Sequence, residues 1–218
     1  MRFRVGSPLF LVRHGQTEWN ATRRFQGQTD IPLNAVGRAQ AVQNGQTLRA
    51  FMHRYGYDPG QLSVISSPLA RAAETAEIVC RELGISPLVR FDTRLKEQFY
   101  GEWEGLLAEE IAARYPQEWD SRKSNFWLFA PSGGESCAHV RARVASLLEE
   151  CQPMTLLIGH FGSLFSALWL AMEQKPQQAV SAQEPTKVRV HQDSVYVIEK
   201  SGVLEVSREH PAGIPFSS

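Results

Sequence analysis

Three short apolar runs stand out along the chain, at residues 8–12, 62–66 and 155–159. Each run is rich in branched residues and is followed by a polar break and then by apolar positions at helical spacing. Runs of this length and composition are typical of parallel strands that are covered on both faces. The pattern therefore predicts a buried parallel sheet with helices between its strands.

The apolar spacing also predicts where the helices lie. Helical periodicity is clear at Val36, Ala39, Val42, Leu48, Phe51 and Tyr55, and again at Val140, Val144, Leu147, Leu148 and Cys151. A further helix is expected after the second apolar run, with Ser67 as its N-cap and Pro68 in its first turn. We expect that helix to end at Leu83, because Gly84 follows.

The C-terminal part of the chain alternates differently. Residues 187–192, 194–199 and 203–207 read as extended segments joined by turns, which predicts added antiparallel strands. Together with the alternating strands and helices before them, they indicate an α/β fold: a three-layer sandwich with a mostly parallel central sheet flanked by helices. We expect one domain over residues 1–218.

Two stretches do not fit regular elements. Residues 15–33 form a polar connection whose length, in a compact domain, is typical of a segment that binds something. Residues 100–131 are broken by Pro116 and Pro131 and are crowded with aromatic rings. These rings are Tyr100, Trp103, Tyr115, Trp119, Phe126, Trp127 and Phe129.

Charge and cysteine content narrow the functional class. Basic and acidic residues both number 23, so no long-range field attracts nucleic acid or an anionic membrane, and any anion site has to be local. No apolar stretch approaches the roughly 20 residues of a membrane span. The three cysteines, Cys80, Cys137 and Cys151, form no CxxC pair, which argues against a zinc site or a disulfide framework and favours the cytoplasm.

The candidate chemistry follows the predicted strands. Arg13 and His14 come directly after the first strand, Arg71 lies early in the helix after the second, and His160 follows the third. Ligands in a parallel sheet bind beyond the carboxyl ends of the strands, so these four side chains are expected to converge. Guanidinium groups near a helix N-terminus suit phosphate oxygens. The pattern therefore predicts a phosphate site inside a neutral protein.

Four segments carry a resemblance to a known family. They are LVRHGQTEWN at 11–20, SSPLARAAETAEI at 66–78, LKEQFYGEWEG at 95–105 and GHFGSL at 159–164. In this order they resemble the histidine phosphatase superfamily, branch 1, the phosphoglycerate mutase-like group, and imply its fold. By this resemblance Arg13, Arg71 and His160 join His14 in the phosphate pocket, Asn20 and Gln26 add hydrogen bonds from the long loop, and Glu97 is the general acid/base.

Such a site needs neither a metal nor a cofactor. A neutral His14 can attack phosphorus in line, provided that its proton sits on the nitrogen facing away from phosphorus. The charges of Arg13 and Arg71, and His160 beside them, would disfavour protonation of His14. A protonated Glu97 can donate a proton to the leaving oxygen and then activate water.

Two assignments have close competitors in the sequence. Glu102 and Glu104 lie near Glu97, and only the register of the motif favours Glu97 as the acid/base. Arg71 could instead pair with Glu74 on its own helix, an interaction worth only ~0.2–0.5 kcal/mol.

Other residues also have a structural alternative. His14, His160 and Glu97 could be metal ligands, although the flanking arginines oppose a cation. Ser132 and Glu135 fit a capping box that opens the next helix, while similar sequences in the family lie near the site.

Two departures from the family affect the pocket. Phe161 stands where the family often has glycine, which predicts a narrowed or rotated pocket, and Gln16 replaces a frequent glutamate. The amides of Asn20 and Gln26 could also serve only to satisfy loop backbone groups.

The expected activity is hydrolysis of a small phosphomonoester. Mutases of the family usually carry an extended insertion after the acid/base motif, whereas residues 98–131 are brief and aromatic. We interpret residues 100–131 as a cap segment over the leaving group that selects a substrate with an apolar or flat body. The rings expected to form it are Trp103, Trp119, Phe126 and Trp127; alternatively, these rings pack a small subdomain. Phosphoglycerate mutase-type transfer and a catalytically silent binding module stay open. The expected partner is a small phosphorylated metabolite, without nucleic acid or membrane, and a homodimer is left open.

Overall fold

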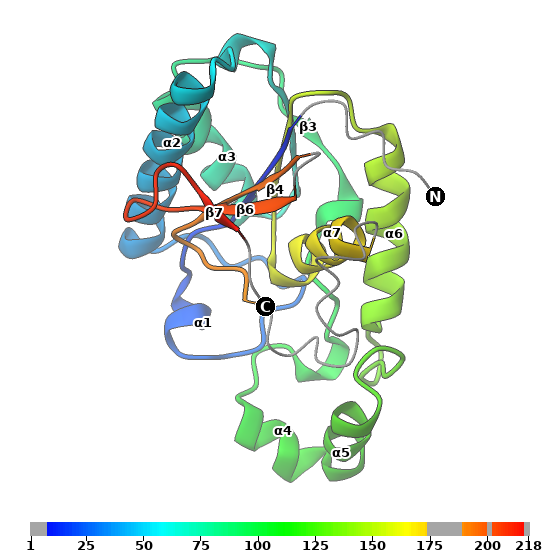
Figure 1. Ribbon diagram of the computed structural model, residues 1–218. Helices are drawn as coiled ribbons and strands as arrows, with labels where there is room; N and C mark the ends of the chain where they lie inside the picture. Colours follow the sequence, from blue (N-terminus) through cyan, green and yellow to red (C-terminus); the bar gives the residue numbers. More distant parts are fainter. Residues whose placement is uncertain (1–7, 174–188, 200–201, 216–218) are drawn as a thin grey trace.

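A central sheet runs through the protein in the computed structural model, which describes residues 8–173, 189–199 and 202–215 (Figure 1). The sheet has seven strands in the order β3-β2-β4-β1-β5-β6-β7. The strands are β1 Leu9–Arg13, β2 Ser63–Ser66, β3 Arg90–Phe91, β4 Thr155–Gly159, β5 Val195–Ile198, β6 Val203–Val206 and β7 Ile214–Pro215. The first four in spatial order are parallel, and β5, β6 and β7 add antiparallel pairs.

The register brings the carboxyl ends of three strands together. Arg13 of β1 lies opposite Gly159 of β4, and Ser66 of β2 lies opposite Ile158 of β4. The backbone amide of His14 extends this pairing by donating to the carbonyl of Gly159 at 2.9 Å. The residues that follow β1, β2 and β4 therefore emerge side by side, as the sequence predicts.

Helices cover both faces of the sheet (Figure 1). They are α1 Glu18–Ala21, α2 Ala35–Tyr55, α3 Ala70–Leu83, α4 Ala108–Arg114, α5 Pro116–Ser124, α6 Cys137–Glu150 and α7 Phe161–Glu173. Helices α2 and α3 lie on one face and α6 and α7 on the other, while α4 and α5 extend away from the sheet. The expected α/β sandwich is confirmed.

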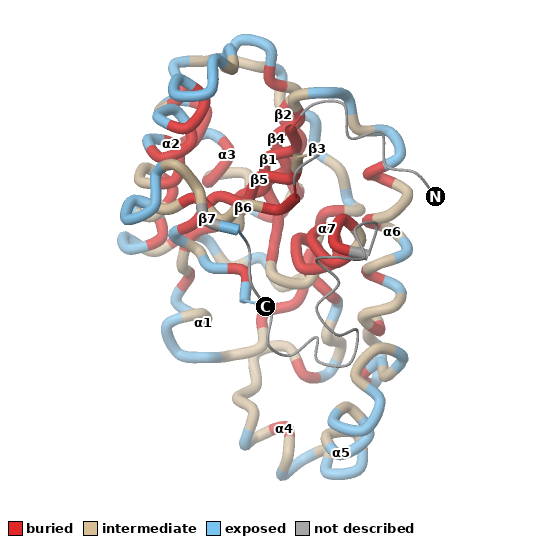
Figure 2. Tube along the Cα trace, in the orientation of Figure 1, coloured by how far each residue is buried: buried red, intermediate tan, exposed pale blue. Residues whose placement is uncertain are grey.

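Alternating side chains of the strands build two separate cores. Leu9 and Leu11 of β1 pack toward α6 and α7, whereas Phe10 and Val12 pack toward α2 and α3. This alternation follows from the two-residue period of a strand. Both layers are buried, so the central strands β1, β2, β4 and β5 appear red between the helices in Figure 2.

The start of α3 differs from the sequence prediction. The helix begins at Ala70, with Leu69 as an N-cap that makes no side-chain hydrogen bond, so Ser67 and Pro68 lie before it. The hydroxyl of Ser67 is instead engaged by the ring of His160 at 2.8 Å. The predicted end of the helix is correct, because Gly84 closes it in the left-handed conformation, with φ 72°.

The helical periodicities also need correction in detail. In α2 the buried face includes Gly37, Ala41 and Leu48, whereas Val36 is 52% exposed. The capping box that opens α6 is formed by Ser136 with His139. The box predicted at Ser132 and Glu135 is therefore wrong.

The C-terminal expectations are met in part. Strands β5 and β6 confirm two of the three predicted extended segments. Of the third, residues 187–188 lie outside the described residues, and residues 189–192 form no strand. No helix in the described part of the chain is both long and apolar enough to cross a membrane.

The three cysteines behave as small apolar side chains. They carry no disulfide. Burial raises the pKa of Cys80, Cys137 and Cys151 to about 11. A thiol with so high a pKa is scarcely ionised near neutral pH, and only the thiolate is a strong nucleophile.

Candidate active site

A cleft of about 240 Å³ opens at the carboxyl ends of β1 and β4. It is lined by Arg13, His14, Asn20, Arg23, Arg24, Phe25, Gln26, Gly27, Arg71, Glu97, Tyr100 and Phe161. All the site residues predicted from the sequence are in this set except His160. Residues that are far apart along the chain thus converge in the way that the strand order predicts.

His14 is held in a single tautomer. Its ring is 2% exposed, and Nδ1 lies 2.7 Å from the carbonyl oxygen of Gly15. A carbonyl oxygen only accepts, so Nδ1 carries the proton and Nε2 of the neutral ring has a free lone pair. Burial, followed by the charges of Arg71 and Arg13, lowers the pKa of His14 well below its ordinary value of 6.5. The ring is therefore neutral near pH 7.

The glycine that follows His14 is required by helix packing. A Cβ on Gly15 would lie 2.1 Å from the backbone oxygen of Gly37, in the first turn of α2. The amide of Gly15 donates to the hydroxyl of Thr75 on α3 at 3.2 Å. The Arg-His-Gly sequence is thus pressed between two helices, which fixes the backbone that carries His14.

Arg71 is fully buried yet has no acidic partner among the described residues. Its nitrogens donate to the carbonyl of Gly27 at 2.7 Å, to the carbonyl of Thr29 at 2.9 Å and to Nδ1 of His160 at 3.2 Å. A guanidinium has five N–H groups, so two of them are left over. The alternative pairing with Glu74 is wrong, because Glu74 binds Arg38 at 2.6 Å.

Arg13 also lacks a carboxylate contact within the described part of the chain. One of its terminal nitrogens donates to the carbonyl of Val190 at 2.8 Å, while Nε is buried without a hydrogen bond. Its guanidinium lies 5.6 Å from the centre of the Phe161 ring. Burial lowers the pKa of Arg13, as it does for Arg71. The cleft thus holds two cations that burial has removed from water, and a bound anion would offset the cost of that desolvation.

His160 lies behind the cleft and does not line it. The residue is fully buried, and its ring centre is 4.9 Å from that of His14. Because Nδ1 accepts from Arg71, Nε2 carries the proton and donates to the hydroxyl of Ser67 at 2.8 Å. Both ring nitrogens are therefore occupied within the protein. Burial and the charge of Arg71 lower the pKa of His160 well below 6.5.

The loop amides present donors to the cleft. The Oδ1 atom of Asn20 accepts from the backbone of Thr17 at 3.1 Å and from Gln192 at 3.1 Å. The Oε1 atom of Gln26 accepts from the hydroxyl of Thr17 at 2.8 Å. These contacts hold both carbonyl ends in place, and neither NH₂ group has a hydrogen bond to a described residue. The two amides are therefore oriented as donors.

Of the three neighbouring glutamates, only Glu97 lines the cleft. Its side chain is largely buried, and Oε1 accepts from the backbone amides of Gln98 and Gly162, both at 2.9 Å. Glu104 instead binds the backbone amides of Gln28 at 2.8 Å and Thr29 at 2.9 Å, which organises the loop. Glu102 is exposed.

The aromatic rings do not lie as the cap hypothesis expects. Trp103 is fully buried, with Trp119 and Phe129 at ring distances of 5.8 and 5.4 Å. Trp127 packs against Phe165 and Trp169 of α7. Trp103, Trp119 and Phe129 thus pack the segment itself, as the alternative interpretation holds, while Trp127 attaches it to α7. The rings that line the cleft are Phe25, Tyr100 and Phe161.

Several cleft residues are missing from the sequence prediction. Arg23, Arg24 and Phe25 lie in the long loop, and Tyr100 lies in the segment after Glu97. Their location in the stretches that resist regular assignment is the signal that could have revealed them. Within the described residues, no group of three or more His, Cys, Asp or Glu side chains is placed to hold a metal ion.

The fold and the cleft define an α/β protein with an anion-accepting site at the carboxyl edge of its sheet. The pattern of the histidine phosphatase superfamily (branch 1) matches residues 9–199. The chain therefore belongs to this superfamily.

Three proteins of similar sequence show the range of activities among the relatives of this chain. The chain is 44% identical over 106 residues to the Uncharacterized phosphatase PhoE of Bacillus subtilis, a match that spans 49% of this chain and 50% of the relative. It is 32% identical to the 2,3-bisphosphoglycerate-dependent phosphoglycerate mutase of Bartonella quintana, over 84% and 89% of the two chains. It is 36% identical to the glucosyl-3-phosphoglycerate phosphatase of Mycobacterium tuberculosis, over 77% and 76%.

A solved structure of a mycobacterial glucosyl-3-phosphoglycerate phosphatase superposes with a TM-score of 0.69 at 28% identity, covering 88% of this chain and 89% of the other. Homologues of the chain are thus phosphatases and phosphoglycerate mutases, and the superfamily indicates an enzyme of this type.

Proposed function

We propose that the protein is a phosphatase that hydrolyses a small phosphomonoester through a phosphohistidine on His14, with Glu97 as the general acid/base. The observation that carries the proposal is the hydrogen bond that orients the His14 ring. Its Nδ1 proton is held by the carbonyl of Gly15, which leaves Nε2 free beside two guanidinium groups. A nucleophile without a proton next to unpaired cations suits attack on a phosphate dianion.

The first step transfers the phosphoryl group to the protein. Nε2 of His14 forms a bond to phosphorus while the ester P–O bond breaks, and protonated Glu97 gives its proton to the leaving oxygen. The second step is hydrolysis. Water attacks phosphorus, Glu97 takes a proton from it, the P–N bond breaks and inorganic phosphate leaves. One carboxyl group serves both steps and is protonated again at the end.

Electrostatic stabilisation falls to the groups that surround phosphorus. Arg13 and Arg71 supply the charge, and the NH₂ groups of Asn20 and Gln26 supply neutral donors. Preorganised donors of this kind account for a large share of many enzymatic accelerations. His160 has no free ring nitrogen, so its role here is to hold Arg71 through Nδ1.

Hydrolysis is favoured over mutase transfer by the short segment after Glu97. Residues 98–131 form two short helices and a buried aromatic cluster, without an extended insertion. That residues 100–131 cap the site stays a prediction, with Tyr100 as the contact that supports it. We further propose a cytoplasmic enzyme that needs no metal or cofactor, acts on a small phosphorylated metabolite, binds neither nucleic acid nor membrane, and has a homodimer as one candidate assembly.

The test is hydrolysis of p-nitrophenyl phosphate with and without EDTA. We expect chelator-resistant turnover that falls by at least ~10³-fold in His14→Ala and by ~10²–10⁴-fold in Glu97→Gln. His53→Ala is the matched control, because His53 is exposed on α2 and does not line the cleft. Trapping of radiolabelled phosphate on the wild type but not on His14→Ala would identify the intermediate.

Three outcomes would contradict the proposal. Loss of turnover with EDTA would indicate a metal enzyme. No turnover across a broad phosphate panel would favour a silent binding module. Conversion of 3-phosphoglycerate to 2-phosphoglycerate, faster than hydrolysis and dependent on 2,3-bisphosphoglycerate, would favour the mutase.

A further inference from the structure

The cleft contains more positive charge than one phosphoryl group requires. Four guanidinium groups line it, from Arg13, Arg23, Arg24 and Arg71, and only one carboxylate, from Glu97. A phosphomonoester dianion balances two of these cations, and Arg13 and Arg71 are the two that lie beside His14. The remaining pair lies in the long loop and is available to the rest of the substrate.

Arg24 and Arg23 differ in how they are held. Arg24 donates to the carbonyl of Gly105 at 2.6 Å and pairs with Glu110 at 3.4 Å, so its charge is already engaged. Arg23 forms no side-chain hydrogen bond or ion pair with any described residue, and it is exposed. Of the two arginines in the long loop, Arg23 is therefore the one that can bind a ligand without giving up a partner.

The backbone holds Arg23 in place. The residue adopts the left-handed conformation with φ 58°, which L side chains rarely adopt. Its amide donates to the carbonyl of Asn20 at 3.1 Å, and the next amide, of Arg24, donates to Trp19 at 2.9 Å. Since Asn20 also lines the cleft, this turn ties the position of Arg23 to the phosphate-binding loop.

We propose that Arg23 binds a second negative charge, carried by the leaving group, so that the preferred substrates are phosphomonoesters with an additional anionic group. The inference rests on the proposed phosphatase activity. It names a substrate class by its charge, with a carboxylate as the simplest example. Arg23 then contributes to specificity by contacting the leaving group, away from the phosphorus atom.

The test compares phenyl phosphate with 4-carboxyphenyl phosphate in wild type and Arg23→Gln at one ionic strength. We expect wild type to prefer the carboxylated ester, and Arg23→Gln to lower kcat/KM for that ester by roughly fivefold to tenfold while phenyl phosphate changes by less than about twofold. Arg38→Gln is the matched control, because it removes the same charge from α2 outside the cleft. Equal changes for both esters, or no change for either, would overturn the inference.

Failure of the proposed function gives a different result. If wild type hydrolyses neither ester, the phosphatase assignment fails, and calorimetric binding of benzylphosphonate and 4-carboxybenzylphosphonate decides the role of Arg23. Tighter binding of the carboxylated analogue that is lost in Arg23→Gln supports the subsite. Equal binding of the two analogues contradicts it.

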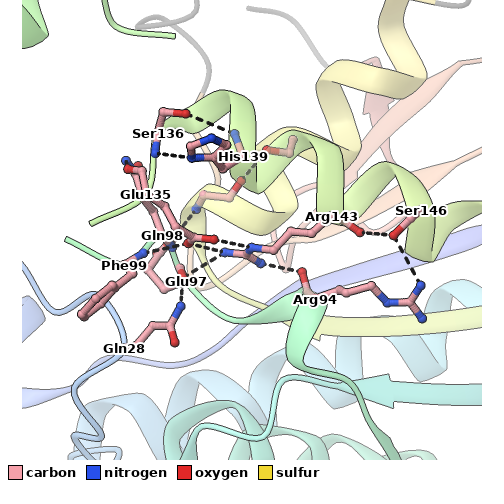
Figure 3. A network of polar contacts seen from close by, with 12 residues as sticks. Gln28, Arg94, Glu97, Gln98, Phe99, Glu135, Ser136, His139, Arg143 and Ser146 are labelled. Atoms are coloured by element: carbon pink, nitrogen blue, oxygen red, sulfur yellow. Dashed lines mark hydrogen bonds and ion pairs between the residues drawn. The ribbon is translucent and has the colours of Figure 1, made fainter. Parts of the chain in front are cut away.

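A second and independent observation concerns the segment that carries Glu97. Residues 96–100 form no regular element, so the position of their backbone depends on side chains around them. Arg143 of α6 donates to two of the nearby carbonyls, that of Arg94 at 2.6 Å and that of Glu97 at 3.0 Å (Figure 3). One guanidinium thus fixes two points of the backbone by hydrogen bonds, one just before the segment and one at the acid/base residue itself.

Glu135 binds both Arg143 and the backbone that follows Glu97. It accepts from Arg143 through two nitrogens, both at 3.1 Å, and from the backbone amide of Phe99 at 3.0 Å. Its own carbonyl accepts from the side chain of Gln98 at 2.6 Å. Figure 3 shows the pair beside this segment, with Arg143 bound to the carbonyl of Glu97 and Glu135 bound to the amide of Phe99. Two-point pairing of this kind is geometrically specific.

We infer that Arg143 and Glu135 are a positioning pair that holds Glu97 at the distance from phosphorus needed for proton transfer. Neither residue lines the cleft, so neither acts on the substrate directly. The inference rests on the proposed role of Glu97. It also gives Glu135 a role, because the capping box of α6 is formed by Ser136 and His139 and does not use Glu135.

The test uses Arg143→Lys and Glu135→Gln. We expect kcat for p-nitrophenyl phosphate to fall ~10- to 100-fold, because displacement of about 1 Å is enough to disrupt proton transfer, with KM within about twofold. Glu150→Gln is the matched control, since it breaks the 2.7 Å pair with Arg94 on the outer side of the same region. Unchanged kcat in both variants, with their melting temperatures preserved, would overturn the inference.

A double-mutant cycle separates positioning from general support of the fold. If Arg143 acts through Glu97, Arg143→Lys loses most of its effect on kcat in the Glu97→Gln background. Equal losses in both backgrounds would show that Arg143 only supports the fold and would contradict the positioning role. If Glu97→Gln turns over like wild type, the acid/base assignment fails, and the positioning pair fails with it.

Discussion

Individual glycines decide how closely the catalytic groups approach one another. Gly162, in the first turn of α7, donates its amide to Oε1 of Glu97 at 2.9 Å, and a Cβ at this position would lie 2.5 Å from the same oxygen. The family resemblance draws attention to position 161, where Phe161 replaces the frequent glycine. In this chain the neighbouring Gly162 provides the space for the carboxylate.

Gly162→Ala is expected to separate activity from stability. The new methyl pushes the Glu97 carboxylate away from its amide donor, so kcat should fall ~10- to 100-fold. The atom that has to move is the end of a flexible side chain, and alanine favours a helix by ~1 kcal/mol over glycine, so the free energy of unfolding should not fall. Steady-state kinetics and urea denaturation measure the two effects.

Gly60→Ala is the control for this substitution, because the nearest atoms that its Cβ would meet belong to the side chain of Asp58, outside the cleft. Unchanged kcat in Gly162→Ala would show that the carboxylate tolerates the displacement and that the hydrogen bond from Gly162 is dispensable.

At the level of elements, the segment from 100 to 131 is attached to the rest of the protein at two places. Near the loop, Phe25 packs against Tyr100 and Trp103 at 5.0 and 6.0 Å. Near α7, Trp127 packs against Phe165 and belongs to the core on that side of the sheet. The first contact borders the cleft, whereas the second does not.

Trp127→Ala should therefore weaken the attachment of the segment without changing the chemistry. Because Trp127 is only partly buried, we expect a loss of about 2 kcal/mol in the free energy of unfolding, below the usual cost of a fully buried tryptophan. The kcat for p-nitrophenyl phosphate should stay within about threefold of wild type, because no group of the cleft is removed.

Urea denaturation and kinetics of the same preparation test this expectation. Leu128→Ala is the control, since Leu128 is 69% exposed and should change stability by less than ~0.5 kcal/mol. A large loss of kcat in Trp127→Ala, with the free energy of unfolding unchanged, would contradict this expectation and would indicate that Trp127 faces the substrate, as the cap hypothesis holds.

Over the whole molecule the positive and negative charges balance, whereas the charge within the cleft is unbalanced. The net formal charge is zero, yet four arginines line one cleft, which also contains the buried His14. Burial and the charge of Arg71 lower the pKa of both His14 and His160. The folded protein therefore resists protonation at positions where the unfolded chain accepts protons readily.

This predicts a specific dependence of stability on pH. Below pH 6.5 the unfolded chain binds protons at His14 and His160 that the folded protein excludes, so the free energy of unfolding falls as pH decreases. The loss should approach about 1.4 kcal/mol per histidine for each pH unit as the pH falls below 6.5. Urea denaturation at pH 7.5, 6.5 and 5.5 measures it.

His160→Gln should reduce the slope of this dependence, because one of the two titrating groups is removed, while His53→Gln at an exposed site should leave it unchanged. A free energy of unfolding that stays constant from pH 7.5 to 5.5 would contradict the exclusion of protons from the two buried rings.

The sequence alone determined the layered fold and the convergence of Arg13, His14 and Arg71. Short branched runs at residues 8–12 and 155–159 are local signals of buried strands, and parallel strands place the residues at their carboxyl ends on one edge. Hydrophobic period and chain direction are enough for both conclusions. Glu97 required the family resemblance, because nothing local distinguishes it from Glu104.

Only the tertiary structure decided how these groups are held. The carbonyl of Gly15 decides which ring nitrogen of His14 carries the proton. The ring of His160 forms hydrogen bonds with Ser67 and Arg71 and does not line the cleft. The hydrogen bond from Arg143 to Glu97 joins residues 46 positions apart in the chain. Such contacts arise from packing between distant segments, which periodicity and propensity, being local properties, do not encode.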